Sequence, residues 1–587
     1  MKASFVALLG LQALIAAAGP ASPADEMKAR FVDMTQKDEG PLSKRACQYA
    51  NCDACWAKYS YCIQCSGPRA TPASCVACLV KCQGLVQSKL SSPVLSILAL
   101  VVASAVFLQI FVTWRRLRHI PGPFLNSISP LVMTYHCLKE DISDYSHRLT
   151  IKYGPLVRVS PNVVMYEDPE TMRRVCSVKA NYTKGLWFEF SRWSLERYSC
   201  IAMRDNESRK ERKAKLLPAW AGQGLTMMES RVDSQVRSFL DLVRRKYVSE
   251  PGVFRPMEFA HRAQFYTLDV VTSVTFGTPF GFLKKDGDVE KYLETTEAMT
   301  PMFGVLGTLP WLVYVMHAWP LNRFMPGEGD KVGFGRLMKF ASDAVQKRLE
   351  PGDKISEYDL IRAYLRNGVE PEDVVQECIT LAVAGSETTS VALRMTMLCL
   401  LTTPEAYCKV QTEIDDFYAK QGLKNGDESV ISYADAKTLP YVQAVVREVL
   451  RLWPPSAGLF TKEVPKEGDT IHGYYVPPGT EVGQCMPSVG KLIRIWGDDF
   501  NIFRPERWLE ASPDKFDEMA AAVDLVFSSG KYVCLGKHIA WMELLKFVVE
   551  VLRRFNVATV NNAQPLKLRD PVTFLSSDFK IRFTKRE

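Results

Sequence analysis

The chain is best understood from one stretch near its C-terminus, Phe527-Ser-Ser-Gly530-Lys-Tyr-Val-Cys534-Leu-Gly536. A helical pattern follows over residues 537–555, so the cysteine lies at a loop-to-helix junction. The dipole and the free N–H groups of a helix N-terminus favour a thiolate there. Gly530 allows a tight turn, Gly536 allows a bulky group to approach, and Phe527 can shield the sulfur from water. The stretch predicts a functional thiolate rather than an inert, buried cysteine.

A second motif lies in an apolar helical run that begins near Pro371, in the sequence Ala384-Gly385-Ser-Glu387-Thr388-Thr. An acid beside a threonine is unusual on the apolar face of a helix. We expect Gly385 to thin the helix so that a ligand can approach, and the Thr388 hydroxyl to hydrogen-bond that ligand. The alternative is a kinked core helix whose threonines bond back to its own carbonyls.

A third motif is Glu448-Val-Leu-Arg451, whose two charged side chains share one helix face and can form an ion pair. Such pairs are common on surface helices, so this one gains its weight from its surroundings. Residues 453–455 read Trp-Pro-Pro, and residues 503–508 read Phe-Arg-Pro-Glu-Arg-Trp.

These motifs, in this order, resemble the cytochrome P450 family, whose heme-thiolate loop reads F-x-x-G-x-x-x-C-x-G. The resemblance is specific over residues 371–536 and looser over residues 121–370. It implies a mainly α fold with small β-sheets over residues 120–587. It also implies heme b as the cofactor, with the Cys534 thiolate as the axial ligand of the iron. The other residues that it places at the cofactor are Phe527, Gly530, Lys531, Gly536, Ala384 and Gly385.

The chain departs from the family pattern where the heme propionates are expected to bind. Tyr532 stands two positions before the cysteine, where the family frequently has an arginine, and Lys531 is the nearest cation. The W-x-x-x-R motif of the family is matched in its letters alone by Trp193-Ser-Leu-Glu-Arg197. A basic stretch at residues 209–215 is a further, loose match.

The resemblance also implies structural features around the core. Glu448 and Arg451 are expected to pair with Arg507 in a network that holds the protein together and takes no part in catalysis. Residues 473–480 resemble a small β-hairpin of the family, and residues 574–583 suit a closing hairpin.

By resemblance, the chain is a heme-thiolate monooxygenase that acts on O2 and a small organic substrate. A thiolate ligand pushes electron density onto iron and favours O–O cleavage. Glu387 and Thr388 are expected to relay protons. The substrate is expected near Ala384, residues 457–460 and residues 187–193, whose aromatic side chains suggest an apolar substrate, although core packing explains them equally well.

The electrons are expected to come from a partner protein. The chain contains neither a G-x-x-x-x-G-K-[ST] phosphate loop nor a convincing G-x-G-x-x-G after a strand, so we expect no nucleotide or flavin module of its own. The resemblance implies a membrane-bound NADPH-cytochrome P450 reductase, with cytochrome b5 as a further possible donor. Lys531, Lys537 and His538 are candidates for docking it. The alternative is that they are ordinary basic side chains exposed to solvent, with no partner to bind.

Composition excludes several other classes of protein. The 587 residues are 47% hydrophobic and 24% charged, which is ordinary for a globular chain and excludes a disordered or fibrous one. Lysine and arginine number 73 against 65 acidic residues, and a net charge of +8 is small for this length. We therefore expect no nucleic-acid partner.

The first ninety residues are surplus to the resemblance. Residues 1–20 are typical of a secretory signal peptide, with a short membrane anchor as the alternative. Residues 21–45 read as a propeptide-like linker that ends in a dibasic pair. Residues 46–88 form a Cys-rich module too small for a large core, so disulfides or zinc–thiolate sites must staple it. The signal peptide favours disulfides.

Residues 94–112 contain no charge and are nearly long enough to cross a bilayer. Trp114, Arg115 and Arg116 follow at once, as they do at the cytosolic end of a transmembrane helix, whereas a buried soluble helix is the alternative. The sequence therefore predicts a single-pass protein of the endoplasmic reticulum membrane. The Cys-rich module would be lumenal and the catalytic domain cytosolic.

Two other functions stay open at this point. The first is a heme-thiolate isomerase or dehydratase that needs no reductase, although Glu387 and Thr388 are residues that such relatives tend to lose. The second concerns the Cys-rich module, which is either a separate secreted binding peptide or the product of a gene-model fusion. The body is similar to fungal members of the family, which often act in secondary metabolism or detoxification.

Overall fold

The computed structural model describes residues 93–350, 359–422 and 428–586. The predicted signal peptide, linker and Cys-rich module lie outside these residues. The chain divides into two units, Met1–Val112 and Thr113–Glu587. Helix α5 (Pro93–Leu117) contains the uncharged run of residues 94–112. In the described part of the chain no helix combines the length and apolar character that crossing a membrane requires, so the predicted transmembrane helix is not supported.

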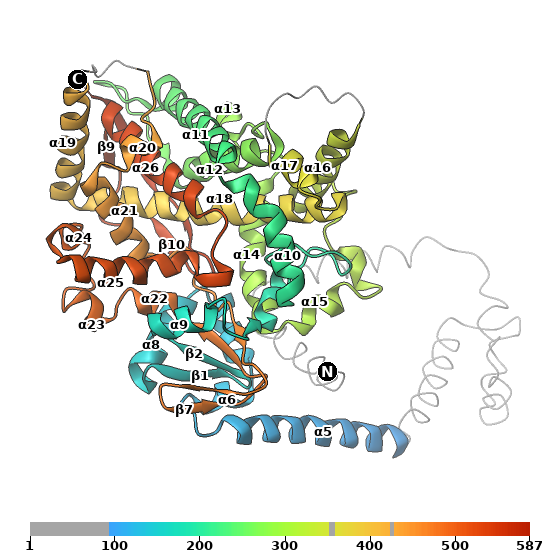
Figure 1. The fold of residues 1–587 in the computed structure, drawn as a ribbon. Helices are drawn as coiled ribbons and strands as arrows, with labels where there is room; N and C mark the ends of the chain where they lie inside the picture. The colour runs from blue at the N-terminus through green and yellow to red at the C-terminus, as the bar shows by residue number, and fades with distance from the viewer. Residues whose placement is uncertain (1–92, 351–358, 423–427, 587) are drawn as a thin grey trace, which may run out of the picture. The chain divides into compact units, whose positions relative to one another are not determined.

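The second unit is built around one long helix, α18 (Pro371–Thr402), which crosses the middle of the unit in Figure 1. Pro371 stands in its first turn, and Glu372 and Asp373 complement the positive end of its dipole. Most of its side chains are buried. The helices that pack most extensively against it are α12 (Phe259–Phe276), α16 (Gly333–Leu349), α21 (Pro440–Leu452) and α26 (Lys537–Arg554).

The remaining helices surround this core. They are α6 (Phe124–Ile128), α7 (Leu131–Leu138), α8 (Ile142–Tyr153), α9 (Pro169–Cys176), α10 (Asn206–Leu216), α11 (Gln223–Leu242), α13 (Phe282–Lys285), α14 (Tyr292–Thr308), α15 (Trp311–Met316), α17 (Leu360–Arg366), α19 (Pro404–Lys420), α20 (Tyr433–Ala436), α22 (Met486–Val489), α23 (Ile493–Trp496), α24 (Glu506–Glu510) and α25 (Pro513–Val523). The predicted mainly helical architecture is confirmed.

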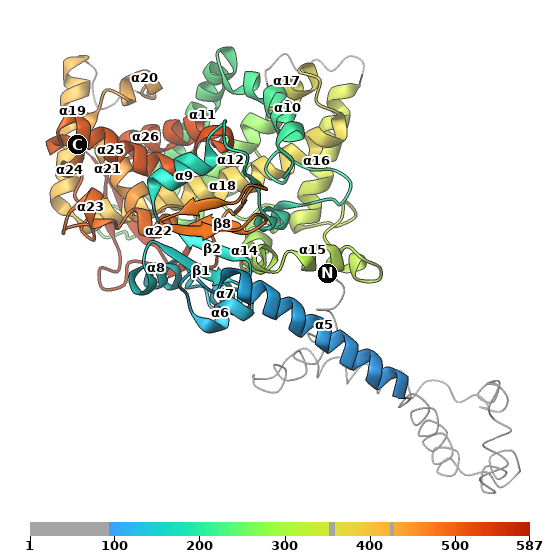
Figure 2. The same cartoon turned by 60° about the horizontal axis from the view of Figure 1, so that its bottom comes forward.

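The largest sheet has five strands in the order β1-β2-β8-β5-β3, and Figure 2 shows β2 and β8 side by side. Its strands are β1 (Leu156–Ser160), β2 (Val163–Tyr166), β3 (Thr183–Lys184), β5 (Lys462–Glu463) and β8 (Glu481–Gln484). The strands β2 and β8 run parallel, whereas the other neighbours are antiparallel. Strand β3 pairs with β5 in this sheet, so residues 183–184 lie beside residues 462–463.

Three smaller sheets complete the unit. The predicted hairpin at residues 473–480 is present as β6 (Asp469–Ile471) and β7 (Tyr474–Val476), shifted a few residues toward the N-terminus. The predicted closing hairpin at residues 574–583 is wrong, because its two strands pair with different partners. Strand β11 (Leu575–Ser577) pairs with β10 (Lys567–Arg569), and β12 (Lys580–Lys585) lies between β4 (Met257–Glu258) and β9 (Phe555–Thr559).

Candidate active site

The loop that carries Cys534 is a closed turn. Its first half is a 3₁₀ turn at Asp524–Phe527, and the backbone N–H of Cys534 donates to the carbonyl of Phe527 at 2.8 Å. Gly530 has a φ of +55°, and a Cβ there would lie 2.2 Å from the carbonyl oxygen of Cys176. The turn therefore requires glycine at this position for two reasons, backbone conformation and space.

Two influences act on the Cys534 thiol in opposite directions. The side chain is accessible to solvent, yet burial among protein atoms raises the pKa of its thiol. Hydrogen bonds from the backbone N–H groups of Gly536 and Lys537, and the charges of Lys213 and Lys537, act to lower that pKa. Coordination to a metal cation would favour the thiolate strongly in such a setting.

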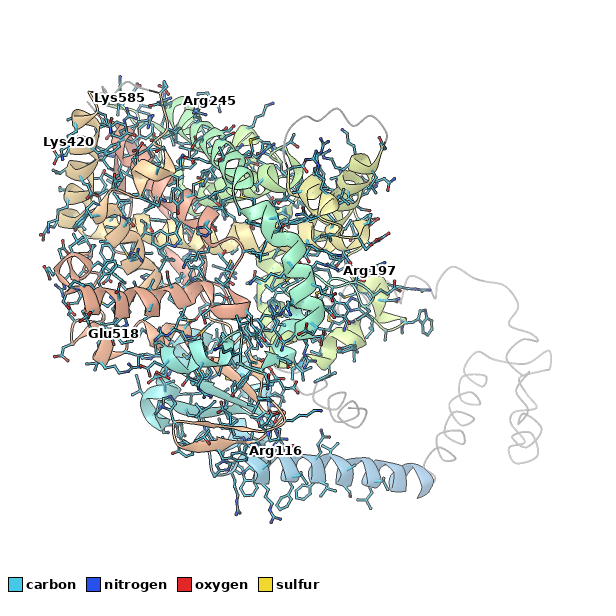
Figure 3. All side chains as sticks on the ribbon, in the orientation of Figure 1. Arg116, Arg197, Arg245, Lys420, Glu518 and Lys585 are labelled. Carbon is cyan, nitrogen blue, oxygen red and sulfur yellow. The ribbon has the colours of Figure 1, made fainter. Side chains whose placement is uncertain are left out.

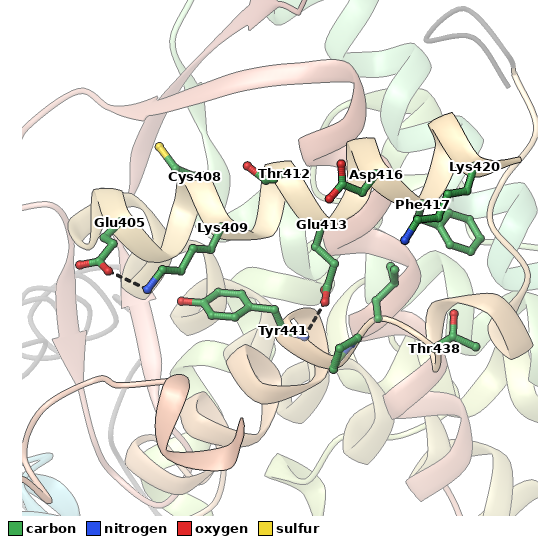
Figure 4. Close-up of a pocket in the computed structure, with 12 residues that line it drawn as sticks. Glu405, Cys408, Lys409, Thr412, Glu413, Asp416, Phe417, Lys420, Thr438 and Tyr441 are labelled. Carbon is green, nitrogen blue, oxygen red and sulfur yellow. Dashed lines mark hydrogen bonds and ion pairs between the residues drawn. The ribbon is translucent and has the colours of Figure 1, made fainter. Parts of the chain in front are cut away.

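The other cysteines of the described residues differ from Cys534. Five of them are buried and Cys200 is partly buried. Cys408 is the other exposed thiol of that set, and it lies on α19 in a surface groove with Glu405, Lys409 and Glu413 (Figure 4). In that groove, Lys409 pairs with Glu405 at 2.6 Å. None of the predicted site residues lines the groove, so we assign it no part in catalysis.

One face of α18 is open near its middle. Ala384 is exposed and Thr388 half-buried, although Ala382 and Ser386 beside them are buried. Residues 384 and 388 are one turn apart, so they share a face. An exposed alanine in the middle of an otherwise buried helix indicates internal space beside it, where a bulky group can lie.

Gly385 has a different role from the one predicted. A Cβ at this position would lie 2.9 Å from Cγ2 of Val271 on α12, so the glycine lets the two helices pack closely. The expectation that Gly385 opens the helix to a ligand is wrong for this reason. At Gly536, by contrast, a Cβ would lie 3.8 Å from the sulfur of Cys534, an ordinary contact on the side that faces the thiol.

The side chains of Glu387 and Thr388, which were predicted to relay protons together, do not bond to each other and have different partners. The Thr388 hydroxyl donates to the carbonyl of Ala384 at 2.7 Å, which is the back-bonding alternative. The Glu387 carboxylate is buried and accepts from Arg394 at 2.8 Å and from the amide of Gln264. It therefore faces α12. Burial raises the pKa of Glu387, and the charge of Arg394 acts to lower it.

Sequence reasoning missed Arg394 and Gln264. Arg394 is buried and also donates to the carbonyl of Ala260 and to the amide oxygen of Gln264, each at 2.8 Å. An arginine seven residues after Glu387, within an apolar helix, was the available signal. Its partner on α12 lies 130 residues away in sequence and carried no signal.

The predicted structural network around Glu448 is confirmed. One carboxylate oxygen accepts from Arg451 at 2.7 Å, from Arg507 at 2.8 Å and from the backbone N–H of Arg504 at 3.1 Å. The other accepts from Arg451 at 2.9 Å and from the indole of Trp508 at 3.0 Å. Glu448 and Arg451 are completely buried, so the network fixes α21 against the segment that precedes α25.

Trp193 and Arg197 do not work together as a motif in the structure, because their side chains contact different residues. The Trp193 indole donates to the hydroxyl of Thr380 at 3.0 Å. Arg197 is exposed at the edge of the unit and lies 3.6 Å from Asp373, and Figure 3 shows its side chain pointing outward. The basic stretch on α10 lies at the cysteine loop instead, because Arg209 and Lys213 both donate to the carbonyl of Lys531.

The sequence pattern described as Cytochrome P450 matches residues 121–583. The chain belongs to the cytochrome P450 family. It is 36% identical to cytochrome P450 monooxygenase ABA1 of Pyricularia oryzae, over 81% of this chain and 94% of that protein. It is 32% identical to aba1 of Botryotinia fuckeliana, over 80% and 92%, and 31% identical to abl1 of Leptosphaeria maculans, over 78% and 80%.

Membership of the family establishes the class of enzyme and its cofactor. The chain is a cytochrome P450 monooxygenase, and the family holds heme b through an axial cysteine thiolate. The residues present fit that cofactor. They provide an accessible thiol enclosed by protein, an open face on the central helix and cations close to the cysteine loop.

Two of the three segments predicted to line the substrate site, residues 187–193 and 457–460, meet in this P450. The ring of Phe460 lies 5.8 Å from that of Phe188 and 6.4 Å from that of Phe190. Sequence reasoning missed Phe303 of α14, which lies 5.9 Å from the rings of Phe190 and Trp193. Phe460 also has a φ of +41°, a conformation that a bulky side chain rarely adopts. These contacts form an aromatic cluster from three parts of the chain.

Proposed function

We propose that this P450 monooxygenase inserts one oxygen atom from O2 into a small apolar substrate, with heme b held by Cys534. The observation that carries the proposal is the Cys534 thiol itself, which is accessible although protein atoms surround it. Bound heme supplies the activation of oxygen, because a thiolate ligand favours O–O cleavage. The protein supplies the position, the protons and the exclusion of water.

The loop around the sulfur has three tasks in this proposal. The N–H groups of Gly536 and Lys537 stabilise the thiolate, since both act to lower its pKa. The partly buried ring of Phe527 covers the loop from water, and the Lys537 ammonium lies 5.8 Å from that ring. Gly530 fixes the turn against Cys176 and so sets the position of the sulfur.

Proton delivery requires a rearrangement on α18. The Thr388 hydroxyl lies on the open face and holds a proton at Oγ1, which it now donates to Ala384. Glu387 can pass a proton to that face only after it leaves Arg394 and Gln264. We therefore expect Glu387 to exchange these partners during turnover, so that it reaches water beside Thr388.

The aromatic cluster around Phe460 supports an apolar substrate. The fungal relatives support a role in secondary metabolism or detoxification, as a proposal from similarity. A separate NADPH-cytochrome P450 reductase would supply the electrons, since the sequence contains no flavin or nucleotide motif. Lys531 and Lys537 are weak candidates for docking it, because two backbone carbonyls hold the Lys531 ammonium and Asp524 pairs with Lys537 at 2.9 Å, which leaves His538.

Location at the endoplasmic reticulum membrane is part of this proposal and rests on the sequence signals before residue 120. Exposed apolar side chains also support membrane contact, among them Phe107 on α5 and Trp319 and Phe324 after α15. Extraction of cell membranes with alkaline carbonate tests the proposal. A protein fully released into the supernatant would contradict it.

The decisive experiment on function is the spectrum of the reduced, carbon monoxide-bound protein. We expect the Soret band typical of thiolate ligation in the wild-type protein and its loss in Cys534→Ala. Persistence of the band in that variant would refute Cys534 as the ligand. A control variant is Cys408→Ala, which removes the other exposed thiol of residues 93–586 that the structure describes and should leave the band unchanged.

A reductase-independent isomerase or dehydratase is the second candidate. The observation that favours it is the Glu387 carboxylate, which Arg394 and Gln264 hold toward α12 rather than toward Thr388. Product formation with and without reductase and NADPH separates the two functions. Turnover that proceeds at full rate without electrons would favour the second candidate.

A further inference from the structure

Five cations gather around the cysteine loop without an acidic partner. Their ammonium and guanidinium groups bond to backbone carbonyls, and within the described residues none forms an ion pair with a carboxylate. They are Lys184, Arg209, Lys213, Lys462 and Lys531. So much unpaired positive charge is costly inside a protein unless an anion completes the site.

The nearest acids are already committed. Glu377 accepts from the backbone N–H of Cys200 at 2.7 Å and pairs with Arg212. Glu481 accepts from the backbone N–H of Leu186 at 3.0 Å and also from a threonine hydroxyl. No hydrogen bond or ion pair joins either carboxylate to the five cations, so no acid among the described residues balances their charge.

Tyr532 lies at the centre of this cluster. Its ring is 4.5 Å from the guanidinium carbon of Arg209 and 4.9 Å from the ammonium of Lys462. Its hydroxyl donates to the carbonyl of Tyr182 at 2.9 Å. Tyr532 therefore provides an aromatic surface against which both cations pack, at the position where the family frequently has an arginine.

Two lysines of the cluster are buried. Lys184 is 6% and Lys462 4% exposed, and the ring of Phe188 lies 4.6 Å from one ammonium and 5.0 Å from the other. Strands β3 and β5 hold them together, because Lys184 and Lys462 are register partners. Burial lowers the pKa of both, that of Lys184 to about 7, so an anion beside them would restore the charged form.

Unused donors remain on the two cations that pack on Tyr532. An ammonium has three N–H groups, and Lys462 uses one of them, on the carbonyl of Phe460 at 2.6 Å. Arg209 is buried, and its Nε has no hydrogen-bond partner. Lys531 is more fully used, because it donates to the carbonyls of Ala180 and Tyr182.

We propose that Arg209 and Lys462, packed on the ring of Tyr532, bind the propionate carboxylates of heme in place of the family arginine. Lys184, whose ammonium lies 4.6 Å from the ring of Phe188, adds a third buried cation. The proposal rests on heme binding at Cys534. It corrects the expectation for Lys531, which ties the cysteine loop to the segment before β3 and leaves the propionates to the other two cations.

The first test measures how fast heme leaves the holoenzyme, by transfer to an excess of a heme-scavenging globin. We expect Arg209→Gln and Lys462→Gln to lose heme about tenfold faster than the wild type, since each removes charge-assisted hydrogen bonds. Lys462→Arg keeps the charge and should stay near the wild-type rate. Lys210→Gln is the matched control, because Lys210 lies exposed on the same helix and pairs with Glu207.

A heme-loss rate that is unchanged in both glutamine variants would overturn the proposal. An equal acceleration in Lys210→Gln would do the same, because it would show a general effect of charge. Failure of the wild-type protein to bind heme at all is a different result, and it would refute the proposed function rather than this assignment.

The second test separates the propionate contact from any loss of folding. The wild-type protein and the two glutamine variants are reconstituted with heme and with its dimethyl ester, whose propionates are uncharged. We expect esterification to weaken binding in the wild type and to have little further effect in the variants, which is the non-additivity of groups in contact. An equal penalty in all three proteins would show that these side chains do not meet the propionates.

Discussion

Substitution of Glu448 by glutamine should destabilise the enzyme strongly, because this carboxylate is the shared acceptor of two buried arginines. Glutamine keeps the shape but replaces one oxygen with an NH2 group. Wherever that group points, it meets an N–H donor, since Arg451 bonds to both oxygens. Breaking a buried ion pair costs about 3–5 kcal/mol. That is a large part of the 5–15 kcal/mol of free energy that ordinarily stabilises a protein.

Urea unfolding of the holoenzyme, followed by tryptophan fluorescence, measures this loss. With a slope of about 4 kcal/mol per molar urea for a domain of this size, the midpoint should fall by about 1 M. Trp508 reports directly, because its indole bonds to Glu448.

The matched control is Glu506→Gln on the neighbouring helix α24. Glu506 pairs with Lys409 at 2.8 Å, but both side chains are partly exposed, so the loss should stay below about 1 kcal/mol. If Glu448→Gln shifted the midpoint no more than this control, the reasoning about the buried network would be refuted.

Three further predictions follow from the site. Cys534→Ser should abolish the thiolate-type spectrum while the far-ultraviolet circular dichroism of the protein stays helical, and retention of that spectrum would contradict the assignment. Arg394→Met should raise the pKa of Glu387 further, because the cation that opposes the effect of burial is gone. The folded state then binds the proton more tightly than the unfolded state, so stability falls as pH rises above the usual value of Glu, about 4.5. The urea midpoint of this variant should therefore lie further below that of the wild type at pH 8 than at pH 5, and an equal deficit at both would count against the pair. Gly530→Ala should cost about 2 kcal/mol or more, because it combines a positive φ with a clash against the Cys176 carbonyl, and an unchanged midpoint would argue against a strained turn.

The aromatic cluster shows where residue-level prediction reached its limit. Residues 187–193 and 457–460 were expected to line one site, and the rings of Phe188 and Phe460 do meet. Phe303 was missed, because α14 has no motif that distinguishes it from any other apolar helix. Which faces of α14 and of the segment after β3 meet depends on how these elements pack, and residue spacing within either one carries no information about that.

Local chemistry was determined by the sequence itself. The Cys534 turn, the Glu448–Arg451 pair and the mainly helical fold follow from short-range spacing, because glycine turns and i, i+3 pairs depend on residues a few positions apart.

The tertiary structure alone decided the partners of long-range groups. It turned Glu387 toward Gln264, set Gly385 against Val271, and placed Lys184 beside Lys462 around Tyr532. These residues lie tens to hundreds of positions apart. A buried charge pairs with whichever group the packing of helices and strands brings within about 3 Å of it. The residues next to that charge in the sequence do not reveal which group this will be.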